Sequence, residues 1–260
     1  MTLLRQNSEL RRDRIWNWTI PASTTVLPDG RIANGCPAAD GCVNLCYARN
    51  GTYLFPAVKA AHQRNMMMAL DDLPAWETTM LTELASKRFR PNGIARFPHL
   101  VEWMQLDEWT AEWAASGGAA IRIHDAGDFF ADDYTEAWLR IAATTSDVLF
   151  YAYTKEVPRF RALVEGTAPI NFRWLYSLGG KFDHLLDLDR DRHADVFPDM
   201  TTLADAGYID QTESDLLCVL APTTRVGIPA NNIRHFRKRQ GNRTFGTIQR
   251  DRDEIRAKRS

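Results

Sequence analysis

The chain has 260 residues, of which 45% are hydrophobic and 25% charged, as in an ordinary soluble globular protein of one large or two small domains. Its formal net charge of −1 excludes attraction of the whole molecule to nucleic acid or membrane. The start, MTLLRQNSELRRDRIW, lacks the apolar run of a secretory signal, and no apolar stretch approaches the roughly 20 residues that span a bilayer. The composition therefore predicts a cytoplasmic protein without a membrane segment.

The N-terminal third predicts a short strand, a loop and two helices. The first twenty residues are polar and basic, and a β-like run follows at 24–27. Pro28, Asp29 and Gly30 form a turn signal. Apolar residues then recur at three- and four-residue spacing over 57–70 and 74–88, which predicts two helices, with Pro74 suited to the first turn of the second.

Strand and helix patterns alternate through the rest of the chain. Helices are expected near 132–144, from 158, around 183–188 and near 200–206, and strands at 119–124, 148–153, 172–176, 194–197 and 216–220. Such units favour a parallel sheet with helical crossovers. Five or six units suit either a doubly wound sheet or a partial (βα) barrel of the TIM type. We predict the partial barrel with extra N-terminal helices, and ligands at the carboxyl ends of the strands.

Three of the four cysteines, Cys36, Cys42 and Cys46, lie within eleven residues with the spacing C-x5-C-x3-C. In a reducing compartment such a group indicates a metal or redox site rather than disulfides. Zinc usually takes paired C-x(2–4)-C hooks, whereas three cysteines in one loop with a distant fourth are typical of an iron–sulfur cluster. We therefore predict a [4Fe–4S] site, with zinc or packed thiols without metal as the alternatives.

Three segments resemble a family of bacteriophage proteins of the gene-product-eighty-eight type: CPAADGCVNLCYARNGTY, RIHDAGDFF and FYAYTK. The resemblance covers about 35–177 and implies a phage origin, the host cytoplasm as location and a cysteine-ligated site, but no reaction. The cysteine loop also resembles that of radical S-adenosylmethionine enzymes, with Leu45 before Cys46 as their large apolar residue, although both spacings differ. This second resemblance implies a radical-SAM-like barrel, with S-adenosylmethionine as a further cofactor.

The fourth cysteine, Cys218, divides these hypotheses. A cluster held by three cysteines leaves one iron open to S-adenosylmethionine, whereas a fourth thiolate closes it. Because the strand predicted at 216–220 should end at the same face as the cysteine loop, we predict Cys218 as the fourth ligand. The alternative is a buried core thiol, since free cysteine behaves as a small hydrophobic residue.

Polar residues after the predicted strands are candidate catalytic groups. His124 could transfer protons, Asp125 and Asp128 could position a substrate or a cofactor hydroxyl, and Lys155 could hold an anion. In the alternative structural interpretation, Asp128 caps the following helix and Lys155 is solvated.

Four further residues are candidate cofactor contacts. Tyr47 and Asn50 flank the cysteine loop and could hydrogen-bond to its sulfur atoms, as could Arg49. Gly179 and Gly180 could let a cofactor approach the backbone closely, although such a pair is also a routine turn.

The C-terminal residues 232–260 carry ten Lys or Arg residues against three acidic ones, a net charge of +7. We predict two regions, a domain at 1–231 with the metal site and a basic extension at 232–260. The extension could contact nucleic-acid phosphates or be a solvated basic helix.

These patterns predict a phage-encoded iron–sulfur protein whose cluster serves structure, electron transfer or sensing. The first alternative is an active radical S-adenosylmethionine enzyme with Cys218 free. The second is a zinc-stabilised nucleic-acid-binding protein that uses the basic tail. Whether the protein is an enzyme stays open at this point.

Overall fold

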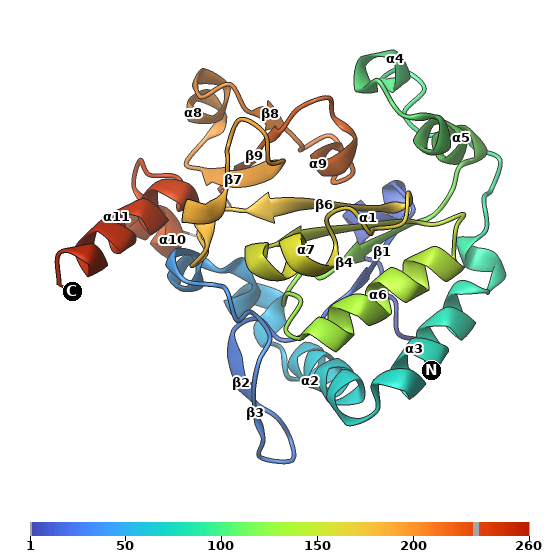
Figure 1. Ribbon diagram of the computed structural model, residues 1–260, viewed down its shortest axis with the longest axis horizontal. Coiled ribbons are helices and arrows are strands. Elements are labelled where there is room, and N and C mark those ends of the chain that lie inside the picture. The colour runs from blue at the N-terminus through green and yellow to red at the C-terminus, as the bar shows by residue number, and fades with distance from the viewer. Residues whose placement is uncertain (1, 231–233, 260) are drawn as a thin grey trace.

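A parallel sheet forms the centre of the protein in the computed structural model, which describes residues 2–230 and 234–259 (Figure 1). Within these residues the sheet has seven strands: β1 (Ile15–Trp18), β4 (Ala120–Ile123), β5 (Leu149–Thr154), β6 (Phe172–Ser177), β7 (His193–Phe197), β8 (Ile209–Asp210) and β9 (Arg225–Pro229). Their order is β1-β4-β5-β6-β7-β9-β8, and all neighbours pair in parallel. The predicted α/β class with a parallel sheet is confirmed.

Apolar cores cover both faces of this sheet. Four helices pack on one face: α2 (Pro56–Asp71), α3 (Leu73–Leu84), α6 (Asp132–Thr144) and α7 (Val157–Leu163) (Figure 1). The other face packs against α1 (Ser8–Arg12), α5 (Glu108–Ser116) and α9 (Leu217–Leu220). Because successive side chains of a strand point to opposite faces, Phe150 and Tyr151 of β5 enter different cores. Burial on both faces makes such a strand a continuous apolar run.

The first strand of the sheet lies in the segment that the sequence marked as polar. β1 consists of Ile15–Trp18, and all four of its residues are buried although charged residues precede them. The run predicted at 24–27 forms β2 (Thr24–Val26), which pairs in antiparallel fashion with β3 (Ile32–Asn34) outside the main sheet. The turn predicted at 28–30 joins these two strands and is confirmed.

Several predicted helices agree with the structure. The observed α6 has the predicted bounds, and Pro74 lies in the first turn of α3. The helix near 200–206 is α8 (Met200–Asp205), whereas 183–188 holds only a 3-10 turn, Asp183–Leu185. Helices that the sequence did not predict include α5 and α4 (Val101–Met104).

The strand predicted at 216–220 is wrong, because this segment forms the short helix α9. Five apolar residues in a row do not reveal whether a buried segment is a strand or a helix turn. The last strand is β9, which the sequence did not reveal, and it lies between β7 and β8. Cys218 therefore lies not at the end of a strand but on a helix that packs on one face of the sheet.

The basic C-terminal region forms α10 (Arg234–Gln240) and α11 (Phe245–Ala257), which lie beside the cysteine loop (Figure 1). The boundary predicted between 231 and 232 falls outside the described residues. Across 2–230 and 234–259, every helix is too short or too polar to cross a membrane.

Candidate functional site

A cavity of about 610 Å³ lies at the carboxyl ends of β4, β5 and β6. Its wall includes Asp125 and Asp128 after β4, Lys155 after β5 and Ser177 at the end of β6. The cysteine loop and Phe245 at the start of α11 complete the wall. The cavity therefore occupies the edge at which parallel α/β sheets bind their ligands.

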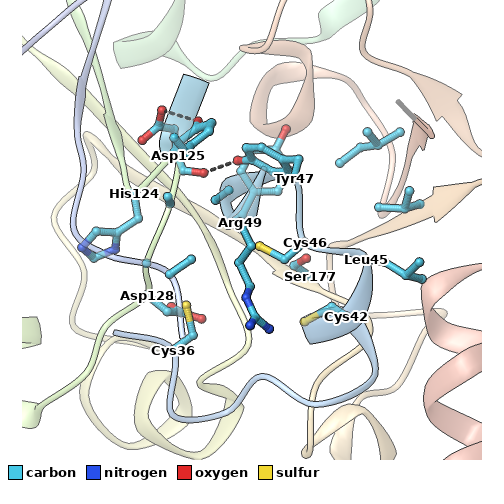
Figure 2. Close-up of a pocket in the computed structure, with 18 of the residues that line it drawn as sticks. Cys36, Cys42, Leu45, Cys46, Tyr47, Arg49, His124, Asp125, Asp128 and Ser177 are labelled. Carbon is cyan, nitrogen blue, oxygen red and sulfur yellow. Dashed lines mark hydrogen bonds between the residues drawn. The ribbon is translucent and has the colours of Figure 1, made fainter. Parts of the chain in front are cut away.

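Cys36, Cys42 and Cys46 all line this cavity (Figure 2). Burial raises the pKa of each thiol, and the charges of Cys42 and Cys46 raise the pKa of Cys36 further. Lys155 acts in the opposite direction on the pKa values of Cys42 and Cys46. The three thiols thus share one cavity and act on one another electrostatically.

No three Cys, His, Asp or Glu side chains among the described residues stand close enough together to hold a single metal ion. In the view of Figure 2, the side chain of Arg49 extends between Cys36 and Cys42. Its Nη1 donates to Val43 O at 3.4 Å, and its charge lowers the pKa of Cys46. The three thiols therefore line one cavity, but they do not converge on a single point.

The glycine pair supports the cysteine loop. Cys42 N donates to Gly179 O at 3.1 Å, and Ala39 forms a β-bridge with Gly180. Gly179 has φ +97°, and a Cβ there would lie 3.1 Å from Cys42 Cβ. The two glycines lie outside the cavity wall, and the backbone that approaches them is that of the cysteine loop.

Helix α11 holds the other side of the same loop. Gly41 N donates to Gln249 Oε1 at 2.8 Å, and Gln249 Nε2 donates to Asp40 Oδ2 at 3.0 Å. Arg252 and Arg256 pair with the buried Asp40 at 2.7 and 2.6 Å. Burial alone would raise the pKa of Asp40, but hydrogen bonds from Arg256 and Gln249 and the charge of Arg252 lower it. The basic tail therefore contributes directly to the position of the cysteines.

Lys155 is half-buried, and its ammonium donates to three oxygen atoms at the end of β6. Its Nζ donates to Ser177 O at 2.8 Å, to Ser177 Oγ at 2.7 Å and to Leu178 O at 3.0 Å. All three acceptors are uncharged, and the charge of Lys155 lowers the pKa values of Asp128 and Asp183 as well as those of Cys42 and Cys46.

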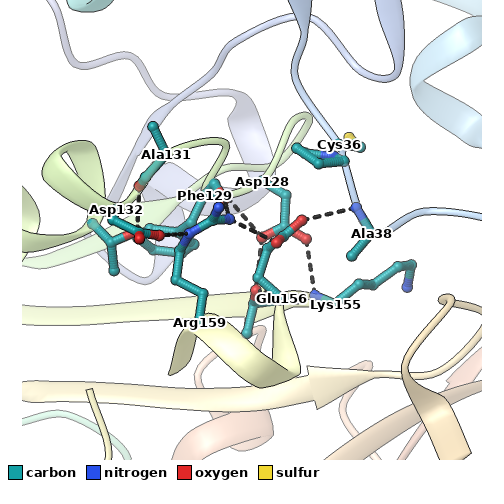
Figure 3. Close-up of polar contacts among 12 residues, drawn as sticks. Cys36, Ala38, Asp128, Phe129, Ala131, Asp132, Lys155, Glu156 and Arg159 are labelled. Carbon is teal, nitrogen blue, oxygen red and sulfur yellow. Dashed lines mark hydrogen bonds and ion pairs between the residues drawn. The ribbon is translucent and has the colours of Figure 1, made fainter. Parts of the chain in front are cut away.

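Asp128 joins the ends of two strands instead of capping a helix (Figure 3). Its carboxylate accepts hydrogen bonds from Thr154 Oγ1 at 2.7 Å and from the backbone N–H groups of Lys155 and Phe129, both at 2.8 Å. Its own N–H donates to Gly35 O at 2.6 Å. Helix α6 begins without a side-chain cap, so the predicted capping role is wrong.

Glu156 lies beside Asp128 and supports the loop after Cys36 (Figure 3). Its Oε1 accepts from Ala38 N at 2.8 Å, and its Oε2 pairs with Arg159 Nη1 at 2.6 Å. Burial and the charge of Asp128 raise the pKa of Glu156 from 4.5 to about 7, despite the opposing effects of Arg159 and Ala38 N–H. The folded protein therefore binds this proton more tightly than the unfolded chain.

This raised pKa predicts a pH-dependent stability. Between pH 4.5 and about 7 the folded state holds more protons than the unfolded state, so the free energy of unfolding falls as pH rises. A pKa unit corresponds to about 1.4 kcal/mol, and we expect on the order of 2 kcal/mol over the window after solvent screening. In Glu156→Gln this part of the dependence of unfolding free energy on pH should vanish, as measured by denaturant titrations of the metal-free protein.

Asp132→Asn is the matched control, because exposed Asp132 pairs with the same Arg159. Its stability should follow the wild-type pH dependence. A Glu156→Gln protein with the full wild-type slope would contradict the assignment of the proton to Glu156.

Asp125 and His124 are held by separate networks. Tyr53 Oη donates to Asp125 Oδ2 at 2.9 Å, Thr19 Oγ1 to its Oδ1, and Tyr47 Oη to its backbone oxygen (Figure 2). The ring of His124 packs on Phe129, and burial lowers its pKa to about 3. Burial therefore favours the neutral ring at physiological pH, and proton transfer by His124, which also lines the cavity, stays a prediction.

Tyr47 and Asn50 also line the cavity, but their polar contacts go to the backbone. Asn50 Nδ2 donates to Cys46 O at 3.3 Å, and Tyr47 donates to Asp125 O. Both residues therefore fix the shape of the cysteine loop, and any contact with a cluster sulfur stays a prediction.

A charged and aromatic cluster surrounds Arg122 and Asp215, two residues for which the sequence suggested no role, on another part of the wall. Arg122 Nη1 lies 3.1 Å from Asp215 Oδ2, and the Arg122 guanidinium lies over the Tyr153 ring at 5.1 Å. Tyr151 donates to Asp215 at 2.5 Å, and Tyr153 donates to Asp215 and to Gln211, both at 3.1 Å. An arginine within the apolar strand AIRI is the sequence signal that could have revealed it.

Cys218 lies in the apolar core below this cluster and does not line the cavity. It is fully buried on α9, and its backbone oxygen accepts from Arg192 Nη1 at 3.1 Å. Burial and the charge of Asp215 raise the pKa of its thiol well above the ordinary value. The structure thus brings three of the four cysteines together in one cavity.

The fold and site define an α/β protein with a cysteine-lined cavity at the carboxyl edge of a parallel sheet. The chain belongs to the family described as Gene product 88, which it matches over residues 1–258. The predicted membership of this phage family is confirmed.

Two curated relatives are Gene 88 proteins of mycobacteriophages. Over 135 residues the chain is 28% identical to that of Mycobacterium phage D29 and 27% identical to that of Mycobacterium phage L5. Each match covers 52% of this chain and 48% of the relative, so the chain spans about half the length of the curated relatives it matches. No solved structure matches the chain.

Proposed function

We propose that the protein binds a [4Fe–4S] cluster through Cys36, Cys42 and Cys46. The observation that carries the proposal is that three thiols of one loop line one cavity at the ligand-binding edge of the sheet. Thiolates suit both iron–sulfur clusters and zinc. In a zinc tetrahedron the sulfur atoms lie about 3.8 Å apart, whereas in a cluster each thiolate binds a different iron. A cluster therefore requires less convergence of the three thiols than a zinc ion does.

The charges around the cavity also suit an anionic group. Thiolates in a buried site need nearby positive charge to stay deprotonated. Lys155 and Arg49 supply it, since the charges of both lower the pKa of Cys46. When bound, the cluster would supply one-electron chemistry, while these side chains hold its charge in place.

The proposal takes three cysteine ligands rather than four. Cys218 lies in the apolar core and outside the cavity wall, so a cluster bound to the loop would have one iron without a cysteine ligand. The nearly sequential order of parallel strands supports a partial (βα) barrel of the radical-SAM type. On this view the protein is an enzyme that takes S-adenosylmethionine at the open iron. The four-cysteine cluster without such chemistry is the competing form.

Anaerobic purification of the full chain tests the proposal. We expect a brown protein with about four irons and four sulfides per chain, which cleaves S-adenosylmethionine under reduction. A colourless protein with stoichiometric zinc would refute the cluster. Iron and sulfide without cleavage would instead support the closed, four-cysteine form.

Nucleic-acid binding through the basic tail stays a prediction. Arg252 and Arg256 of α11 pair with Asp40, and Arg243 pairs with Asp251, so part of the tail's charge serves the fold. Arg237 and Lys238 on α10 are exposed and are the residues that could reach phosphates. The host cytoplasm likewise stays the predicted location.

A further inference from the structure

The cavity wall contains an arginine that uses few of its donors. Arg122 makes one polar contact among the described residues, the 3.1 Å approach of its Nη1 to Asp215. Its Nε is buried and has no hydrogen-bond partner within the described part of the chain. A guanidinium has five N–H donors in a planar fork that matches carboxylate and phosphate groups. The Arg122 side chain is 20% exposed and lines the cavity, so the rest of its guanidinium is available to a ligand group there.

Asp215 does not saturate this arginine, because its two oxygens are shared. Tyr151 donates to Oδ2 and Tyr153 donates to Oδ1, so the contact with Arg122 is a single one rather than a bidentate pair. The Tyr153 ring below the guanidinium fixes its plane. Lys155, by contrast, already donates to three oxygen atoms, so it has no such unused donors.

We propose that Arg122 binds the anionic group, a carboxylate or a phosphate, of a small substrate held in the cavity. Arg122 and the three cysteines line the same cavity, and its volume of about 610 Å³ lies within the usual range of small-molecule sites. The anionic end would be fixed on the rigid strand β4 while the remainder of the molecule faces the sulfur atoms. The inference rests on the proposed function for the reaction, but anion binding itself needs no metal.

Anion binding can therefore be measured on the metal-free full chain. Inorganic phosphate and succinate serve as probes in thermal unfolding and calorimetric titration, with sodium chloride holding the ionic strength constant. We expect one of the two to raise the Tm saturably, which identifies the class of the anion. Arg122→Gln should weaken that binding at least tenfold. Asp215→Asn should strengthen it several-fold, because it removes the competing charge and keeps an acceptor for the tyrosine hydroxyls.

Arg190→Gln is the matched control, since Arg190 is exposed and lies outside the cavity wall. Equal binding by wild type and Arg122→Gln, no binding of either probe, or weaker binding by Asp215→Asn would overturn the proposal. If Arg122→Gln does not fold, the change in anion affinity of Asp215→Asn decides whether the proposal holds. Iron content of reconstituted Arg122→Gln should equal that of wild type, so failure of the anion site and failure of the cluster are separate results.

Discussion

Single replacement of Cys36, Cys42 or Cys46 by alanine is expected to lower the iron content at least tenfold, whereas Cys218→Ala should keep it. The three thiols line one cavity, and the loss of one leaves too few thiolates to hold the cluster. Cys218 is buried outside the cavity wall, so alanine removes one core thiol and its hydrogen bond with Tyr153 but none of the loop thiols. Iron and sulfide per chain after anaerobic reconstitution are the measured quantities.

Cys218→Ala is also the internal control, because it removes a thiol without touching the loop. Circular dichroism establishes that each variant folds. If Cys218→Ala folds but loses its iron as the loop variants do, the cluster has four protein ligands and the three-cysteine form is wrong. Full iron in all three loop variants would contradict the cluster site itself.

The largest loss of stability is expected for Asp128→Ala. The carboxylate accepts from Thr154 Oγ1 and from the N–H groups of Lys155 and Phe129, and all of these contacts are buried or partly buried. Each buried donor left unpaired costs about 1–3 kcal/mol, so we expect a loss of roughly 4 kcal/mol in the free energy of unfolding. Denaturant titration of the metal-free protein gives this value.

Two further variants test this explanation. Asp128→Asn keeps the size and one acceptor oxygen, so it should lose less than half as much. Asp205→Ala, at an exposed position in α8, should change stability by less than about 0.5 kcal/mol. A loss below about 1 kcal/mol in Asp128→Ala would show that other groups replace the carboxylate as acceptor.

The sheet was predictable where its strands are continuous apolar runs. β5 is buried on both faces, β4 and β6 are mostly apolar with one arginine each, and helices with clear spacing separate the three strands. β1 was missed because its four buried residues follow a charged segment, and α9 was misassigned because LLCVL is too short to show a period. In each case tertiary burial, which one local window does not contain, decided the outcome.

The part of the site that the sequence could predict is the part formed by residues close together in the chain. The cysteine triplet is a local pattern, and all its members line the cavity. The pairing of Arg122 with Asp215 joins positions 93 residues apart, and Gln249 reaches Asp40 across 209. Such contacts depend on the order of strands in the sheet and on where the tail folds back. A single sequence without relatives shows neither the order of the strands nor the position of the C-terminal helix.

The contact between Asp40 and Gln249 has a consequence for folding during synthesis on the ribosome. Ribosomes add roughly 5–20 residues per second, so on the order of 10–40 seconds separate the emergence of these two residues. During that time the cysteines are already present in the growing chain, but α11 does not yet exist. The cysteine loop therefore gains its contacts with Gln249 only after the last helix has been synthesised.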